Sequence, residues 1–139
     1  MSIYTALNTA LYSTLAGGTA LTALLADATS VYFEQAPDDA EMPYVVFNFQ
    51  ALGDGNVTPH RTKDALVFAR AYNQTGPALA GTIDAQIDAL LHGKVISVAG
   101  WANFWTAREQ DLSVVETDSA NVKTWMAGGL YRLRLEKTT

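Results

Sequence analysis

The chain begins with two amphipathic stretches. In the first, an apolar residue recurs at every fourth position: Ile3, Leu7, Leu11 and Leu15. This spacing predicts a helix that Ser2 can cap and that Gly17 and Gly18 end. Thr19 can cap a second, shorter helix, whose apolar positions are Leu21, Leu24 and Leu25. Because two helices this short cannot bury their apolar stripes alone, we expect a sheet to cover them.

Three segments in the first half of the chain show strand patterns. Residues 31–33 form a short apolar run, and the polar stretch 34–41 that follows it predicts a loop. Residues 44–51 alternate, and one face carries Val45, Phe47, Phe49 and Ala51. A glycine-rich turn at 53–56 leads to a strand over 65–72, which is apolar on both faces. That pattern indicates a central strand.

The second half predicts one long helix and further strands. The helix starts at Pro77, ends at Gly93 and leaves Asp84, Gln86 and Asp88 on its solvated side. A short apolar run at 95–98 and one or two strands over 101–115 come next. A long terminal strand over 125–135 contains Gly128 and Gly129, which suggest a bulge or kink.

The order of these elements defines the fold class. Strands with hairpin-like spacing, rather than regular strand-helix alternation, predict an α+β fold with a mainly antiparallel sheet and helices packed on one face. A chain of 139 residues fits one domain, residues 1–139. The strands at 44–50 and 125–135 could complete the domain's own sheet or extend a sheet between subunits. We favour the first role for 44–50 and leave the second strand open.

Composition and charge indicate which kinds of partner the chain could bind. Hydrophobic residues make up 49% of the chain and charged ones only 17%, which mildly favours an oligomer. A formal charge of -5 repels polyanions, so gripping DNA would require a concentrated basic patch. The nearest cluster, Arg132, Arg134 and Lys137, is interleaved with Glu136 and is typical of a solvated strand face.

The sequence contains no pattern that predicts catalysis, a metal site or a cofactor. Cysteine is absent, and the two histidines, His60 and His92, lack the spacing of metal ligands. The acidic stretch at 38–41 lacks the remaining positions of a calcium loop. On a strand, Glu109 and Asp111 would share a face opposite Arg108, which fits cross-strand pairing better than a catalytic cleft. We therefore expect a protein that is not an enzyme.

Targeting features are also absent from the sequence. The start of the chain lacks the basic residues of a secretory signal, and no apolar run approaches the ~20 residues that a spanning helix needs. We expect no membrane partner and an origin in the cytoplasm.

The order and spacing of these segments resemble a known family. The stretch Ala6-Leu7 to Leu15, the 31–32 strand, the Ala36-Pro37 loop and the run Met42 to Phe47 resemble the tail-completion (tail-terminator) proteins of long-tailed bacteriophages. The later helix and the strand around Arg108 fall in the same order, so the likeness covers nearly the whole chain. The glycine-rich 126–129 segment departs from it.

The resemblance implies a structural role in the virion. Such a protein would form a homo-oligomeric ring, a hexamer, at the head-proximal end of the tail. The ring would cap the tail tube, meet the head connector and let double-stranded DNA pass without specific binding. A globule of this length is about 37 Å across, and six of them in contact enclose a hole of about one diameter. Loops that could line this lumen or contact partners carry Asp38, Asp39, Glu41, Asp54, Asn56, His60 and Arg61.

Two other readings remain open from the sequence. A head-completion adaptor or a tail-tube subunit could be built on a similar small α+β fold, and a tube subunit would form open-ended stacks. A small-ligand or enzyme domain with a pocket under the second helix belongs to a different class. A deep pocket with convergent polar groups would favour that class.

Overall fold

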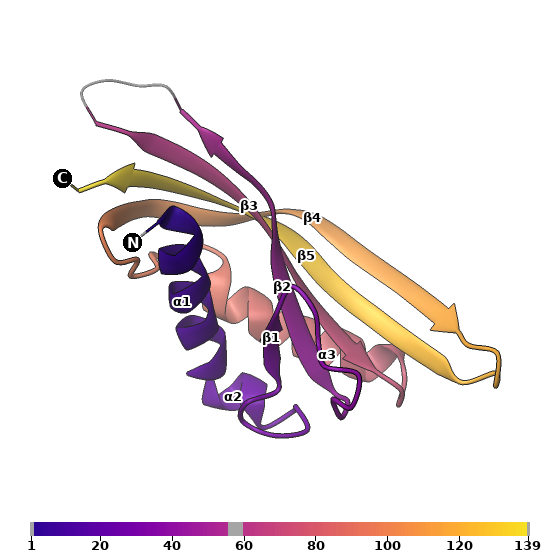
Figure 1. Ribbon diagram of the computed structural model, residues 1–139. Coiled ribbons are helices and arrows are strands. Elements are labelled where there is room, and N and C mark those ends of the chain that lie inside the picture. Colours follow the sequence, from indigo (N-terminus) through magenta and orange to yellow (C-terminus); the bar gives the residue numbers. More distant parts are fainter. Residues whose placement is uncertain (1, 56–59, 139) are drawn as a thin grey trace.

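A computed structural model describes residues 2–55 and 60–138 (Figure 1). It confirms the α+β class. The elements in chain order are α1 (Ile3–Ala16), α2 (Thr19–Thr22), β1 (Val31–Phe33), β2 (Tyr44–Asp54), β3 (Thr62–Asn73), α3 (Pro77–Leu91), β4 (Trp101–Thr117) and β5 (Lys123–Lys137).

The strands form one sheet with the order β1-β2-β3-β5-β4. Only the β1–β2 pair is parallel, and every other neighbouring pair is antiparallel. The strand predicted to be central, β3, is the middle strand. The terminal strand β5 lies between β3 and β4, so it completes the domain's own sheet and offers no free edge. The two edges are β1, with 3 residues, and β4, with 17.

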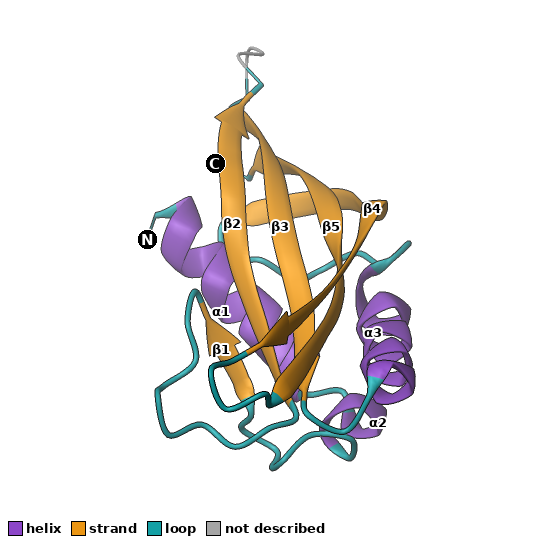
Figure 2. Cartoon of the chain, turned by 90° about the vertical axis from the view of Figure 1, so that its right-hand side faces the viewer, coloured by secondary structure: helices purple, strands orange, loops and turns teal. Residues whose placement is uncertain are grey.

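Helices α1 and α3 pack on the same face of this sheet, as predicted (Figure 2). Between Lys63 and Asn73, the central strand presents small buried side chains to them: Ala65, Val67, Ala69 and Ala71. This lets the larger helix side chains approach the sheet closely, and they are Leu7, Leu11, Leu15, Ile83, Ile87 and Leu91. Helices and sheet therefore share one hydrophobic core, and none of the described helices lies on the other face of the sheet.

Two local predictions are wrong. Gly18, rather than Thr19, is the N-cap of α2, and Thr19 is its first helical residue. In β2 the register shifts between Phe49 and Ala51. The extra residue, Gln50, turns Ala51 to the opposite face from Phe49, so Ala51 is exposed instead of lying on the core side.

The glycine pair in β5 does not form a bulge. β5 pairs with β3 without a register shift from Trp125 to Glu136. Against β5, it is β4 that carries the irregularities, between Asn103 and Trp105 and between Arg108 and Gln110. The bent strand is thus β4.

The first β4 irregularity encloses a buried polar network around Asn103, which is 6% exposed. Its Oδ1 accepts the backbone N–H of Ile96 at 2.8 Å and the Thr106 hydroxyl at 3.1 Å. Its Nδ2 donates to the carbonyls of Trp105 and Arg134 at 2.9 and 3.0 Å. One amide thus joins the 94–100 segment, β4 and β5.

We expect Asn103→Leu to lower the free energy of unfolding by about 2 kcal/mol, because it leaves buried backbone groups without partners. Thr106→Val, which removes one hydrogen bond of the same network, should cost about 1 kcal/mol. Urea unfolding followed by circular dichroism measures both. Equal losses for the two variants would contradict a central role for the amide.

Candidate interaction surfaces

The β4–β5 hairpin extends beyond the rest of the sheet (Figure 1). The last residue pair between β3 and β5 joins Asn73 to Trp125, so the hairpin beyond this point has no third strand beside it. We call residues Ser113–Lys123 the arm. All of them are exposed. The turn is nevertheless ordered, since the Asp118 carboxylate accepts the backbone N–H groups of Ala120 and Val122, each at 2.9 Å.

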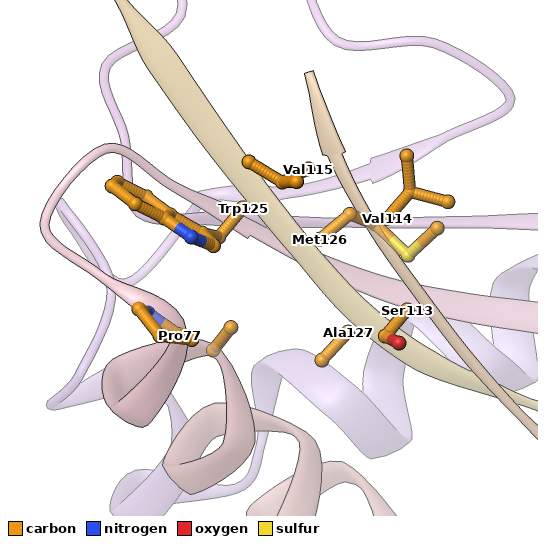
Figure 3. A pocket seen from close by; sticks show the side chains of 8 residues that line it. Pro77, Ser113, Val114, Val115, Trp125, Met126 and Ala127 are labelled. Carbon is orange, nitrogen blue, oxygen red and sulfur yellow. The ribbon is translucent and has the colours of Figure 1, made fainter. Parts of the chain in front are cut away.

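The arm carries exposed apolar side chains. Val114, Val115 and Val122 are 47%, 55% and 41% exposed. At its base lies an apolar pocket of about 320 Å³, between the start of α3 and the hairpin (Figure 3). It is lined by Pro77, Ala80, Ser113, Val114, Val115, Trp125, Met126 and Ala127. None of these side chains titrates, so the pocket offers packing surface rather than acid–base chemistry.

The face of the sheet that carries no helix is unusually apolar. An antiparallel sheet that faces water normally alternates apolar inside with polar outside. Here the outward positions of β3 from residue 66 onward are half-buried Leu66, Phe68, Arg70 and Tyr72, whereas Thr62 and Asp64 form a polar end of the same face. Tyr44 packs against Tyr72, with ring centroids 5.5 Å apart, and also against Tyr32 at 5.8 Å. We call Tyr44, Phe68, Arg70 and Tyr72 the open face; Val46 beside them is buried, at 4% exposed.

Arg70 is the cation at the centre of this open face. Its guanidinium lies 5.9 Å from the Phe68 ring and 6.0 Å from the Tyr72 ring. Nη2 donates to Asn48 Oδ1 at 2.7 Å, while Nε is buried and has no hydrogen-bond partner among the described residues. Within the described part of the chain, Arg70 is the one arginine without an ion pair.

A second cation, Arg108, ties α3 to the hairpin. It donates to both oxygens of Asp84, at 2.9 and 2.8 Å, to Asp111 at 2.6 Å and to the Tyr131 hydroxyl at 3.0 Å. Its Nη2 also donates to the Gly128 carbonyl at 2.8 Å. Although burial opposes the charge, the hydrogen bonds that Arg108 donates to Asp84 and Asp111 outweigh it and raise the pKa of Arg108. Burial likewise raises the pKa of Tyr131.

This cluster corrects two predictions. Asp84 is not on a solvated side, since only 19% of its side chain is exposed. The register shift at Glu109 puts Arg108 and Asp111 within hydrogen-bond distance of each other, while Glu109 pairs with Arg132 across the strands. Glu109 and Asp111 therefore do not share a face. Cross-strand pairing itself is confirmed by the Glu109–Arg132 contact.

A shallow depression of about 350 Å³ adjoins the Arg108 cluster, and it includes His92, Asp88 and Asp111. Its polar groups are already engaged with one another. His92 Nδ1 accepts the backbone N–H of Arg108 at 3.0 Å, and the Arg108 guanidinium is held by carboxylates. The arrangement stabilises the fold and leaves no unpaired acid–base couple there.

The residues predicted for loops lie in two separate places. Asp38, Asp39 and Glu41 are exposed in the β1–β2 loop, next to Tyr44. Asp54, His60 and Arg61 lie at the other end of β2, which is about 35 Å long. Asn56 falls outside the described residues. Both groups could line one passage only if β2 runs along its axis.

Asp54 differs from the other predicted carboxylates because it is neutralised. Its Oδ1 lies 3.0 Å from Arg61 Nε and 2.9 Å from Lys63 Nζ. Hydrogen bonds from these two cations lower the pKa of Asp54 to about 2. The free negative charge is therefore in the β1–β2 loop.

This pair gives a pH prediction. Since the folded pKa of Asp54 is depressed, its stabilising contribution is present above the ordinary aspartate pKa and is lost as the pH falls toward about 2. Carboxyl NMR should show Asp54 titrating near 2. Arg61→Gln should move the midpoint of Asp54 upward. An unchanged midpoint would show that Arg61 does not hold the carboxylate.

Two structural features bear on membranes and metals. Among residues 2–55 and 60–138, no helix is long and apolar enough to cross a membrane. Within the same residues, no three His, Asp or Glu side chains gather closely enough to hold a metal ion.

The fold recurs in solved structures. A chain from the virion of a native gene transfer agent particle superposes with a TM-score of 0.83 at 18% sequence identity, covering 97% of this chain and 98% of that one. A second solved structure matches with a TM-score of 0.55 at 13% identity, covering 97% of this chain and 93% of that one. No curated protein sequence matches the chain.

The sequence pattern of the family described as Tail completion protein gp17 matches residues 9–126. The chain belongs to this family, as its resemblance to tail-completion proteins predicted. It is a structural protein of phage tail completion, a virion component and not an enzyme.

Proposed function

We propose that this protein forms a hexameric ring that caps the tail tube at its head-proximal end and joins it to the head connector. The observation that carries this proposal is the presence of two different surfaces on one chain, the exposed arm and the half-buried, aromatic open face. Two unlike surfaces on each subunit support a head-to-tail contact, and such contacts close into rings when the rotation per subunit divides a full turn.

The same geometry supports termination of the tube. A tube stops growing when the exposed face of its last ring no longer offers the patch that the previous ring offered. In our proposal one side of the ring binds the tail tube protein and the other binds the head connector. The lumen passes double-stranded DNA without gripping it.

The exposed carboxylates of the β1–β2 loop are the lumen candidates that the charges favour. Asp38, Asp39 and Glu41 form no ion pair with any described residue, whereas Asp54 is paired with Arg61 and Lys63. A negatively charged wall repels the DNA backbone and lets it slide. His60 and Arg61 fit a partner contact at the β2–β3 end rather than the lumen.

Assembly on purified tail tubes tests the main proposal. Native mass spectrometry should give six copies, and electron microscopy should show one ring at one end of each tube, with elongation stopped. Open-ended stacks of the protein would favour a tube subunit instead. Binding to the connector but never to tubes would favour a head-completion adaptor.

A charge test addresses the lumen. The variant Asp38→Asn, Asp39→Asn, Glu41→Gln should slow DNA ejection from assembled particles, because DNA would meet a less repulsive wall. Asp27→Asn, in an exposed turn elsewhere, serves as the control. Ejection at the unchanged rate, in particles that carry the triple variant, would remove these loops from the lumen.

A further inference from the structure

The arm and the open face differ in charge as well as in position. The arm presents Val114 and Val115 together with Glu116, whose carboxylate forms no ion pair with any described residue. The open face presents aromatic rings around Arg70, which also lacks an ion pair among the described residues. The arm thus offers a carboxylate, and the open face offers a guanidinium that could pair with it.

Arg70 is prepared to receive a carboxylate. Its side chain is held between the Phe68 and Tyr72 rings and by Asn48, so little conformational entropy remains to be lost on binding. Its buried Nε is unsatisfied within the described chain. Because Nε is closed to solvent, a carboxylate from a partner would pair with the rest of the guanidinium, whose charge no ion pair among the described residues balances.

We propose that the arm of one subunit lies across the open face of the next subunit, with Glu116 paired to Arg70 and the arm valines covering the aromatic rings. This inference rests on the proposed ring and names the contact that closes it. The occupant of the open face is therefore a second copy of this chain.

Charge complementarity is the argument for a second copy. Each chain carries a formal charge of -5, so copies repel one another unless opposite charges meet locally. Arg70 against Glu116 supplies such a pair. Within its own chain Glu116 forms no ion pair with Arg70.

The contact also accounts for the exposed valines of the arm. An arm with exposed valines and an unpaired strand edge promotes aggregation unless a partner covers it. In the closed ring, one repeated contact would cover the valines and the strand edge of every arm.

A charge-swap experiment tests the contact on the full chain, alone and with purified tubes. We expect Arg70→Glu and Glu116→Arg each to raise the protein concentration for half-assembly by about tenfold or more, and Arg70→Glu/Glu116→Arg together to recover most of it. Val114→Ser/Val115→Ser should weaken assembly as well without changing charge. Lys94→Glu, a charge reversal at an exposed residue outside both the arm and the open face, should leave it within about twofold. Thermal melting verifies that each variant is folded, and Arg70→Gln replaces Arg70→Glu if that variant is not.

The possible outcomes distinguish failure of the proposed contact from failure of the proposed ring. Rings that form equally well in both single variants, or single defects that the swap does not recover, overturn the contact and leave the ring proposal standing. Compensation seen in the melting temperature of the monomer but not in assembly would mean that the arm closes on its own chain, which also overturns it. Loss of tube binding with intact rings assigns the open face to the tube protein. A wild-type protein that never self-associates overturns both proposals.

Discussion

Replacing Gly128 by alanine should lower the free energy of unfolding by about 3 kcal/mol. A Cβ at this position would lie 2.8 Å from the Arg70 Cα and closer still to the Ala69 carbonyl oxygen. These are backbone atoms of the central strand, so they cannot move aside as the end of a flexible side chain could. Strands β3 and β5 would have to separate where the open face and the hairpin meet. Urea unfolding with a fluorescence probe measures the change.

Gly81 provides the matched control for this substitution. It lies within α3, and a Cβ there would meet no atom within 4 Å. Gly81→Ala should therefore raise the free energy of unfolding by about 0.5–1 kcal/mol, because alanine loses less entropy in a helix. If Gly128→Ala were as stable as Gly81→Ala, the close approach of the two strands would not constrain the residue at 128.

The sequence predicted the elements better than it predicted their faces. The spacing of Leu7, Leu11 and Leu15 fixes a helix face through contacts within one segment, and that prediction is confirmed. Alternation along a strand fixes faces only while the register continues. The bulges at Gln50 and Glu109 each insert one residue, and their positions depend on how a partner strand pairs. Local pattern alone does not contain that information.

Gly128 illustrates the same limit. Its residue type predicted a backbone irregularity, since glycine often marks a bulge. The structure shows that glycine is required because another strand lies too close for a side chain. Both causes select glycine, and only the tertiary arrangement distinguishes them.

The candidate surfaces were predictable only in part. The β1–β2 loop was recognised as polar and exposed because Asp38, Asp39 and Glu41 follow one another closely. The arm was missed, because its length depends on where β3 ends relative to β5, at the pair Asn73–Trp125. Arg70 left one signal in the sequence, since it is the single charged residue in the apolar run 65–72. The sequence alone could not show that Arg70 lies on the face opposite to the helices.

The second large effect concerns Arg108, whose side chain is 14% exposed. Arg108→Met should lower the free energy of unfolding by about 3 kcal/mol, because it leaves Asp84, itself mostly buried, without its cation. It also removes the donor to the Gly128 carbonyl and to the Tyr131 hydroxyl. The result should be a looser attachment of α3 to the base of the hairpin, seen as faster amide hydrogen exchange in both segments.

Two further variants determine whether the loss of stability comes from an unpaired buried charge. Arg108→Met/Asp84→Leu removes both charges and should recover stability to within about 1 kcal/mol of the wild type, since a buried ion pair can often be replaced by apolar packing. Arg132→Met breaks the more exposed pair with Glu109 and should cost at most about 0.5 kcal/mol. Equal losses at Arg108 and Arg132, or no recovery in the double variant, would show that side-chain packing rather than charge governs this site. Because the arm projects from the same hairpin, a loss at Arg108 that also weakens ring assembly would connect the stability of its base to the contact that the arm makes.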